Sequence, residues 1–554
     1  MSFRLRIRRL RYHVSSLCTG FVQSLLACTT RSSTTMGGPS TITFLQDATH
    51  ILTGELSPVR RASVTVTMSE SLSPSADRSS TTIGGPLQAS LGAVPCAHRQ
   101  GINTLSDDVL LEIFDLYVNY LLIQTNGWHT LVHVCQRWRH VVFASPRRLN
   151  LRLEYTGKRP MSEMLDVWPI LPVVISYGSD LSTSWENVAV ALESEHRHRI
   201  CQINLRNIPT SAWKRLAAAM QKPFPELSHL VFWAKDNTVT PLPDSFLGGY
   251  SPLLRLLWLD NCPFPGVPKL LLSSNQLVVL DLFYIPNSGY ISPQDLVTAL
   301  SVLSRLETLR LQFQSPRYPA SRPRRPLTRS VLPVFTRLAF RGVHEYLEDL
   351  LAQIEAPLLT TLYVTFFMDI DFVLPQLHRL ISQVESFNSC DRATVRISGH
   401  AIRFTISSGT NQPPDLSLKI ICSELGSQFA SLAQVCSSTF PFLSTLVNLD
   451  FEDDVLQSHW KDVTETTPWL ELLAPFTAMK DLRLTHQAAP HVCQALEELA
   501  GERVTEILPA LQNIFLEGLG PLGSVPKYIE GFVAARKHSG HPVAVQGIGP
   551  RQDR

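Results

Sequence analysis

Residues 254–262 of this chain read LRLLWLDNC. Leucines stand at positions 254, 257 and 259, in the pattern L-x-x-L-x-L, and an Asn-Cys pair follows at 261–262. A short apolar run of this kind, closed by a residue that favours turns, is typical of a buried β-strand. The stretch therefore predicts one strand whose leucines face a core that must be supplied by other parts of the chain.

The pattern returns along most of the chain. Its first positions from Ile200 to Leu359 are spaced by 27, 27, 23, 29, 29 and 24 residues, and helix-like runs separate the strand-like ones at 213–220, 294–303 and 346–354. The instances begin at Ile200, Leu227, Leu254, Leu277, Leu306, Phe335, Leu359, Leu446, Met479 and Leu511. Repeats of this length stack on their neighbours, because one repeat cannot bury its apolar face alone.

This periodicity resembles that of leucine-rich-repeat proteins in an irregular form. It implies an α/β solenoid over 150–545, with parallel strands on a concave face and helices on the convex one. Residues 149–153, LNLRL, are a candidate first strand, and the period is lost over 387–444, where we expect an interrupted or distorted array. An ordinary α/β domain, which also alternates strands and helices, is the alternative.

The two ends of the chain differ from the array. Residues 1–46 contain no acidic residue and begin with five arginines by position 11, and RSSTTMGGP at 31–39 returns as RSSTTIGGP at 78–86. Segments rich in Ser, Thr, Gly and Pro bury too little apolar surface to offset the entropy of ordering. We therefore expect 1–98 and the tail 546–554 to be disordered, with a mitochondrial transit peptide as the lesser alternative for the basic arm.

A short helical module is predicted between these regions, at 99–149. Ser106 followed by two aspartates reads as a helix start, and apolar residues then recur at helical spacing up to Tyr117. A second helix is predicted over 128–143. A unit of this size buries little surface by itself, so a partner or the rest of the chain would stabilise it.

The module resembles the F-box, with Ser106 where that family usually has proline. The matches include the helix that ends in Ile-Phe and the later Val-Cys-x-x-Trp, and the whole resembles F-box proteins common in mushroom-forming fungi. The resemblance implies docking onto the Skp-type adaptor of a cullin-based ubiquitin ligase. The residues it assigns to that contact are Leu105, Val109, Leu110, Ile113, Phe114, Val134, Cys135 and Trp138.

The function that follows is that of a substrate-recognition adaptor, with partners in a Skp-type adaptor, a cullin scaffold and an unknown target protein. The alternative is a protein-interaction scaffold that joins no ligase. Side chains in or beside the predicted strands are the candidates for contact with the target: Trp233, Trp258, Phe283, Gln312 and Arg341.

The sequence contains no motif that indicates catalysis, and its composition limits the class of protein. The chain has 554 residues, 44% of them hydrophobic and 17% charged, with a net charge of +2, which excludes a coiled-coil rod, a collagen, a wholly disordered chain and a polytopic membrane protein. No GxSxG or Walker loop occurs, and Gly518, Gly520 and Gly523 match the dinucleotide fingerprint by spacing alone. We expect no catalysis, cofactor, metal, nucleic acid or membrane partner.

The ten cysteines form no CxxC pair and no disulfide framework. We interpret them as buried, reduced thiols of a cytoplasmic or nuclear protein.

Overall fold

The computed structural model describes residues 105–120, 127–165, 169–177, 184–236, 240–263, 267–316, 329–367, 374–408, 415–422, 424–453, 466–485, 487–499, 503–517 and 525–549. The disorder expected over 1–98 and the glycine cluster at 518–523 lie outside these residues. The chain divides into two compact units, Met1–Arg152 and Leu153–Arg554, which are described separately. The boundary falls three residues later than the predicted one at 149.

The first unit contains three described helices, α2 (Asp107–Tyr120), α3 (Gly127–Val132) and α4 (Gln136–Ala144). Ser106 acts as predicted, since its Oγ accepts a hydrogen bond from the backbone N–H of Val109 at 3.4 Å. The single helix predicted over 128–143 is wrong. Cys135 has an extended backbone and caps the N-terminus of α4, so the helix stops after Val132 and a new one starts at Gln136.

The predicted strand at 149–153 is also wrong. The N–H of Leu149 donates to the carbonyl of Ser145 at 3.2 Å, that of Leu151 donates to Pro146 at 2.9 Å, and Asn150 has a φ of 48°. These bonds wind the chain into turns after α4, and the first strand begins only at Leu153. Leu149 and Leu151 are buried, as their alternation in the sequence suggested, but the hydrogen bonds of the turns determine the backbone conformation.

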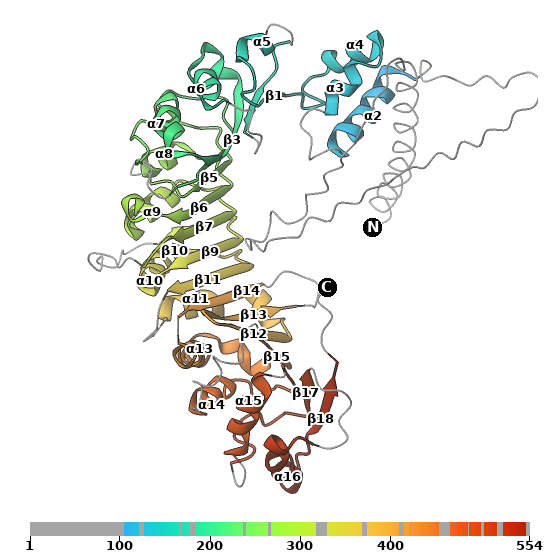
Figure 1. Cartoon of the computed structure of the whole chain (residues 1–554), viewed down its shortest axis with the longest axis vertical. Helices are drawn as coiled ribbons and strands as arrows, with labels where there is room; N and C mark the ends of the chain where they lie inside the picture. The colour runs from blue at the N-terminus through green and yellow to red at the C-terminus, as the bar shows by residue number, and fades with distance from the viewer. Residues whose placement is uncertain are drawn as a thin grey trace, which may run out of the picture. The chain divides into compact units, whose positions relative to one another are not determined.

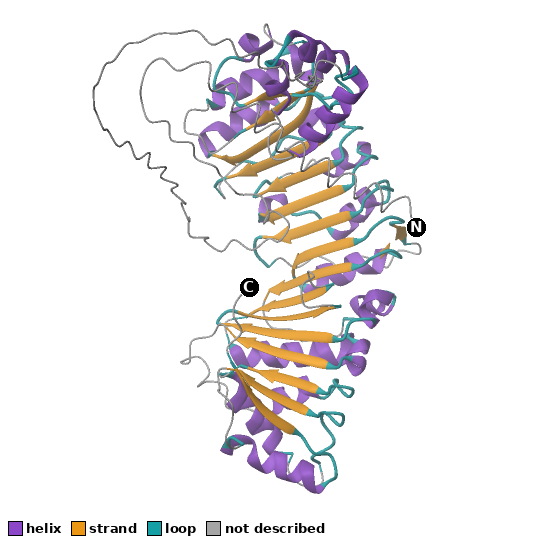
Figure 2. Cartoon of the chain, turned by 90° about the vertical axis from the view of Figure 1, so that its right-hand side faces the viewer, coloured by secondary structure: helices purple, strands orange, loops and turns teal. Residues whose placement is uncertain are grey.

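The second unit is built on a 16-stranded sheet in which most neighbours are parallel (Figure 2). The strands follow the order β1-β2-β3-β4-β5-β6-β7-β9-β11-β14-β13-β12-β15-β16-β17-β18. Their bounds are β1 Leu153–Tyr155, β2 Val173–Ser176, β3 Ile200–Ile208, β4 His229–Ala234, β5 Leu256–Asp260, β6 Val279–Ile285, β7 Thr308–Phe313, β9 Arg337–Gly342, β11 Thr361–Phe367, β12 Arg392–Ser398, β13 Ala401–Ser407, β14 Leu416–Ile421, β15 Asn448–Asp453, β16 Asp481–Leu484, β17 Asn513–Glu517 and β18 Ala544–Ile548. A separate two-stranded sheet pairs β8 (Ser330–Val331) with β10 (Ile354–Glu355).

Helices occupy the connections and lie along one face of the large sheet (Figure 1). They are α5 Met161–Leu165, α6 Trp185–Glu193, α7 Thr210–Ala219, α8 Val267–Ser273, α9 Pro293–Leu300, α10 His344–Gln353, α11 Pro375–Ser382, α12 Glu385–Asn388, α13 Leu425–Thr439, α14 Thr467–Leu473, α15 Ala488–Glu497 and α16 Glu530–His538. The helix-like runs predicted at 213–220, 294–303 and 346–354 correspond to α7, α9 and α10. Strands that follow chain order except at β12–β14, with helices on one side, form a mixed α/β unit that resembles a leucine-rich-repeat solenoid.

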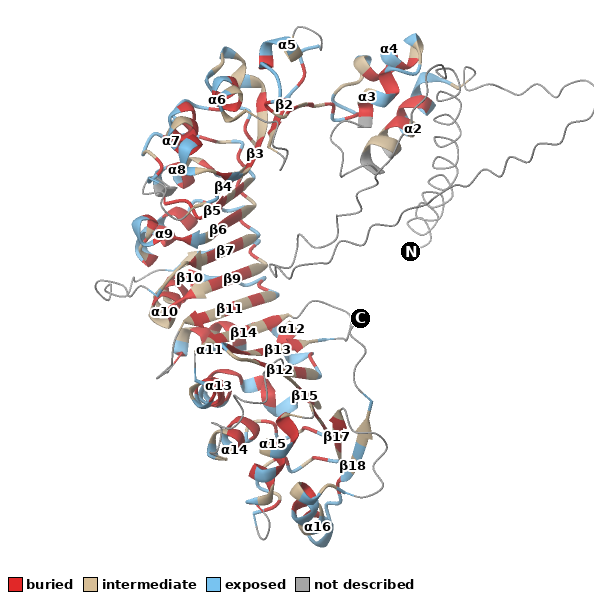
Figure 3. Ribbon diagram, viewed as in Figure 1, coloured by how far each residue is buried: buried red, intermediate tan, exposed pale blue. Residues whose placement is uncertain are grey.

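Burial alternates along the strands and explains why repeats must stack (Figure 3). In β5, Leu257 and Leu259 are buried while Trp258 between them is only half-buried. Leu257 pairs in register with Leu280 of β6, which pairs with Leu309 of β7. Each such leucine contributes about 1.5–3 kcal/mol when it is fully removed from water, and only a neighbouring repeat can cover it.

The interruption of the parallel array that was expected over 387–444 is confirmed. There the chain makes two antiparallel pairings, β12 with β13 and β13 with β14. Parallel pairing resumes on both sides, since β14 pairs with β11 and β12 pairs with β15. The three-strand insertion therefore keeps the sheet continuous. At the other end, β18 extends to Ile548, beyond the boundary predicted at 545.

Candidate functional site

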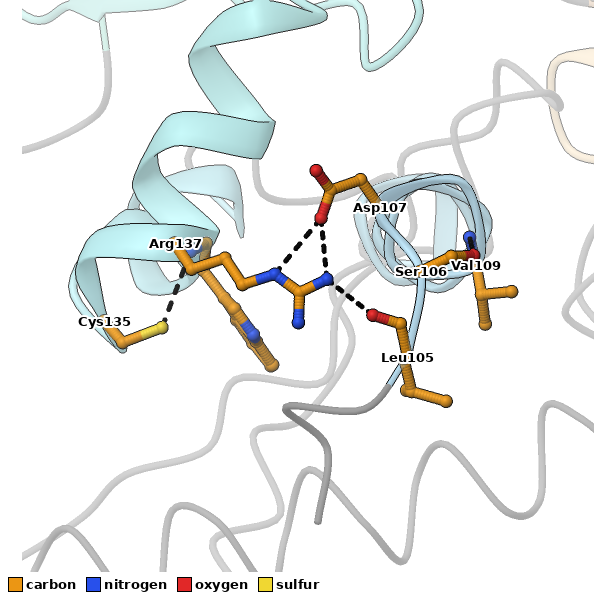
Figure 4. Close-up of polar contacts among 7 residues, drawn as sticks. Leu105, Ser106, Asp107, Val109, Cys135 and Arg137 are labelled. Atoms are coloured by element: carbon orange, nitrogen blue, oxygen red, sulfur yellow. Dashed lines mark hydrogen bonds and ion pairs between the residues drawn. The ribbon is translucent and has the colours of Figure 1, made fainter. Parts of the chain in front are cut away.

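The start of α2 and the start of α4 are joined by Arg137 (Figure 4). Its Nη2 lies 2.7 Å from Oδ1 of Asp107 and also donates to the carbonyl of Leu105, and its Nε donates to the same Asp107 oxygen at 3.1 Å. Nearby, the Sγ of Cys135 accepts the N–H of Trp138 at 3.5 Å. The Val-Cys-x-x-Trp spacing thus has a local structural role, which is to cap α4 and aim its first turn at α2.

The residues assigned to the adaptor contact fall into two groups. Leu110, Phe114 and Trp138 are buried inside the unit, where the rings of Phe114 and Trp138 lie 4.8 Å apart. Their assignment to the adaptor contact stays a prediction, and in this structure their side chains are buried, with Trp138 6% exposed. Val109 and Val134 are 44% exposed. Those two remain candidates for the contact, together with the half-buried Leu105, Ile113 and Cys135.

The residues assigned to the target contact share one face of the large sheet. Each alternates with buried core residues on its strand, and they lie on the neighbouring strands β4, β5, β6, β7 and β9: Trp233, Trp258, Phe283, Gln312 and Arg341. We call this face, opposite the helices, the open face. Trp233 pairs with Asp260, which pairs with Phe283, and Gln312 pairs with Arg341, so most of these positions form one band across the strands.

Aromatic rings and arginines alternate along this band. The Trp258 and Phe283 rings have centroids 5.3 Å apart, and the Arg206 guanidinium of β3 lies 5.8 Å from the Trp258 ring. Such distances suit ring contact and cation–π attraction. Arg206 was not identified as a candidate from the sequence. Its closeness to Trp258, two strands away, follows only from the register of the strands in the sheet.

Arg341 is held in the same manner. Its guanidinium lies 5.7 Å from the ring of Tyr284 and 5.0 Å from the ring of Phe367, on strands to either side of β9. The Nε atom is buried and makes no hydrogen bond to the described residues. The two rings therefore fix the position of the cation without neutralising its charge.

Asp260 is the functional candidate that sequence reasoning missed most clearly. It lies in the open-face band between Trp233 and Phe283, is only 9% exposed, and its carboxylate makes no hydrogen bond or ion pair to any residue in the described ranges. Burial raises the pKa of this carboxyl from 3.8 to about 6. Asn261, with a φ of 56°, turns the chain away immediately afterwards and donates its N–H to the Phe283 carbonyl at 2.9 Å. The acid at the end of the L-x-x-L-x-L stretch was the available signal.

A second acid of the same face shows the contrast. Asp281 of β6 is also buried, and burial raises its pKa to about 6, but one of its oxygens lies 2.9 Å from Nη1 of Arg310. Arg310 on β7 thus pairs with Asp281, whereas Asp260 has no such cation among the described residues.

Substitution of Asp260 by asparagine is expected to stabilise the protein. The folded-state pKa is raised, so the favourable contribution is present below the unfolded pKa of 3.8 and is lost as pH rises through 6. Two pH units correspond to roughly 3 kcal/mol, which Asp260→Asn would recover at pH 7.5. Urea unfolding of both proteins should show this gain at pH 7.5 and much less of it at pH 4. An equal difference at both values would contradict the assignment.

The described residues offer little that points to chemistry. Among them there is no group of three His, Cys, Asp or Glu side chains that could hold a metal ion. Burial raises the pKa of the Cys262, Cys436 and Cys493 thiols well above the usual value. Such thiols are poor nucleophiles. No helix in the described part has the length and hydropathy that a membrane span requires.

Comparisons with known proteins leave the family open. No family model matches the chain, and no curated protein matches it. One solved structure that does match is a leucine-rich-repeat-containing protein, LegL7, from Legionella pneumophila, with 14% identity over 70% of this chain and 98% of that chain, and a TM-score of 0.24. A TM-score this low does not establish a common fold. The leucine-rich-repeat-like description of the second unit therefore stands on its own strand order and repeat spacing.

Proposed function

We propose that this chain is a protein-interaction scaffold whose open face captures a target. The observation that carries the proposal is a band of half-buried aromatic rings and charged side chains across β3–β9, formed by Arg206, Trp258, Asp260, Phe283 and Arg341. Aromatic and arginine side chains are the residues that most often dominate binding energy at protein interfaces. Their position on a long rigid sheet keeps the ordering cost of binding low.

The finer proposal is that the scaffold serves a ubiquitin ligase. The first unit would bind a Skp-type adaptor, itself held by a cullin, and the open face would hold the target for a separate enzyme. The F-box-like order of motifs supports this, together with the exposure of Val109 and Val134 on α2 and just before α4. The chain would perform no covalent chemistry and would act by bringing the target close to that enzyme.

Introducing charge at Val109 and Val134 is expected to abolish adaptor binding. Val109→Asp with Val134→Asp places two desolvated carboxylates in an apolar contact, and unpaired buried charges cost several kcal/mol. Titration calorimetry with purified full-length chain and purified Skp-type adaptor should show at least a hundredfold loss of affinity.

The matched control is Val190→Asp, an equally simple change at an exposed valine of α6 in the second unit. This variant should bind the adaptor with unchanged affinity. If the unaltered chain shows no affinity for the adaptor, the ligase role is wrong and the ligase-independent scaffold remains as the proposed function.

A further inference from the structure

Asp260 and Arg341 carry opposite charges and lie on the open face at the same level of the sheet. Asp260 ends β5, and Arg341 lies on β9 with Gln312 as its register partner on β7. The side chains of both lack a charged or hydrogen-bonding partner within the described ranges. Charges that are withdrawn from water are normally paired, so the buried Asp260 carboxyl and the partly buried Arg341 guanidinium indicate groups that an outside ligand completes.

The surroundings of Asp260 suit a cation. Its register neighbours on the two adjacent strands are Trp233 and Phe283, and the Trp258 ring lies 5.3 Å from that of Phe283. An ammonium group among aromatic faces gains cation–π attraction, and an ionised carboxylate beside them adds an ion pair. The raised pKa of Asp260 agrees with this, because a cation beside the carboxyl would lower its pKa.

The surroundings of Arg341 suit a carboxylate. Tyr284 and Phe367 flank its guanidinium at 5.7 and 5.0 Å, and they orient the group without occupying its donors. A guanidinium that is already fixed in position binds a carboxylate with little further loss of side-chain entropy.

The separation of the two groups sets the spacing in the ligand. From β5 to β9 there are three neighbour steps, through β6 and β7, which is about 14 Å at ~4.8 Å a step. An extended peptide that lies across the strands advances ~3.4 Å a residue, so four residues also cover about 14 Å. Side chains four apart in an extended chain point to the same side, as simultaneous contact requires.

We propose that the open face binds an extended segment of a target protein in which a lysine and an acidic residue stand four positions apart, with the lysine against Asp260 and the acid against Arg341. This deepens the proposed capture of a target by the open face and rests on it. Trp233, Trp258 and Phe283 line the lysine site, and Tyr284 and Phe367 support the acid site.

Fluorescence anisotropy on the full chain tests the proposal with labelled nine-residue peptides of serine and glycine. One pair of probes carries a lysine and a glutamate four apart, in either order, and a second pair carries them five apart. At least one of the four-apart probes should bind ten or more times more tightly than both of the five-apart probes, in which the two side chains point to opposite sides. Equal affinity for the two spacings would overturn the proposal.

Variants locate the contacts. Asp260→Asn and Arg341→Gln should each weaken the four-apart probe tenfold or more, and Arg341→Gln should have no effect on a probe whose glutamate is replaced by glutamine. Arg341→Glu should bind a probe with lysines at both places. The control is Asp244→Asn with Arg305→Gln, which removes the same two charges at exposed positions outside the strands. Full affinity after the changes at 260 and 341 would also overturn the proposal.

The outcome can be separated from that of the proposed function. A chain that binds the Skp-type adaptor but does not distinguish the two probe spacings contradicts the peptide chemistry alone. A chain that prefers the four-apart probe but does not bind the adaptor contradicts the ligase role alone.

Discussion

Replacement of Trp138 by alanine is expected to unfold the helical unit over 105–152 while the sheet stays folded. Trp138 is buried, its ring contacts Phe114 at 4.8 Å, and its N–H anchors the cap formed by Cys135. Loss of a buried tryptophan side chain costs about 3–5 kcal/mol, and a unit of this size has little more stability than that.

Hydrogen exchange followed by mass spectrometry on the full chain measures the effect by segment. Peptides from α2, α3 and α4 should lose their protection in Trp138→Ala, and peptides from β4 to β7 should keep it. Val134→Ala is the control, because that side chain is exposed and its loss should change little. Retained protection in α2 after Trp138→Ala would show that this tryptophan does not hold the unit together.

The second large effect is expected at Arg536, in the last helix of the array. Its guanidinium is fully buried and donates to three backbone carbonyls, those of Val504, Pro509 and Leu511, at 3.4, 3.3 and 3.1 Å. Arg536→Leu would leave these carbonyls buried without a donor, and each unsatisfied group costs about 1–3 kcal/mol. The C-terminal repeats should therefore lose roughly 4 kcal/mol or more of stability.

The reach of this change tests the solenoid as well as the arginine. Because each repeat contacts only its neighbours, protection should be lost in β17, α16 and β18 and kept in β4 to β7. Arg503→Leu is the matched control, since Arg503 is exposed and, among the described residues, forms an ion pair with Glu506 alone. Uniform loss of protection along the sheet would contradict a quasi-linear array.

The repeat spacing was enough to predict strands β3–β7, β9, β11 and β15–β17 and their parallel stacking, because buried leucines at regular intervals admit few other arrangements. It could not predict how the interruption folds. Ala393, Val395 and Ile397 alternate as in any strand, and only the short connection from Ser398 to Ala401 makes the pairing antiparallel. The helix start at Ser106 was readable in the same way, whereas the division of the apolar residues of this unit between interior and surface depends on how α2 and α4 pack.

Asp260 shows what sequence reasoning lacks at the candidate site. One aspartate after a leucine-rich stretch is unremarkable, and its meaning comes from Trp233 and Phe283, 27 and 23 residues away in the sequence and adjacent in register. Tyr284 and Arg341 are brought together by the same register across two strands. The stacking of repeats decides which charged and aromatic side chains meet across strands, and a local sequence pattern does not contain this information.

Hydroxyl-radical footprinting can show whether the open face is the surface that recognises the target. The full chain would be labelled alone and with peptides selected from a random display library for binding to it. Labelling is expected to fall at Trp258 and Phe283 when peptide is bound and to stay unchanged at exposed Tyr250, which lies outside the strands. Unchanged labelling at Trp258 and Phe283, with protection at Tyr250 or on the helices, would contradict this role of the open face.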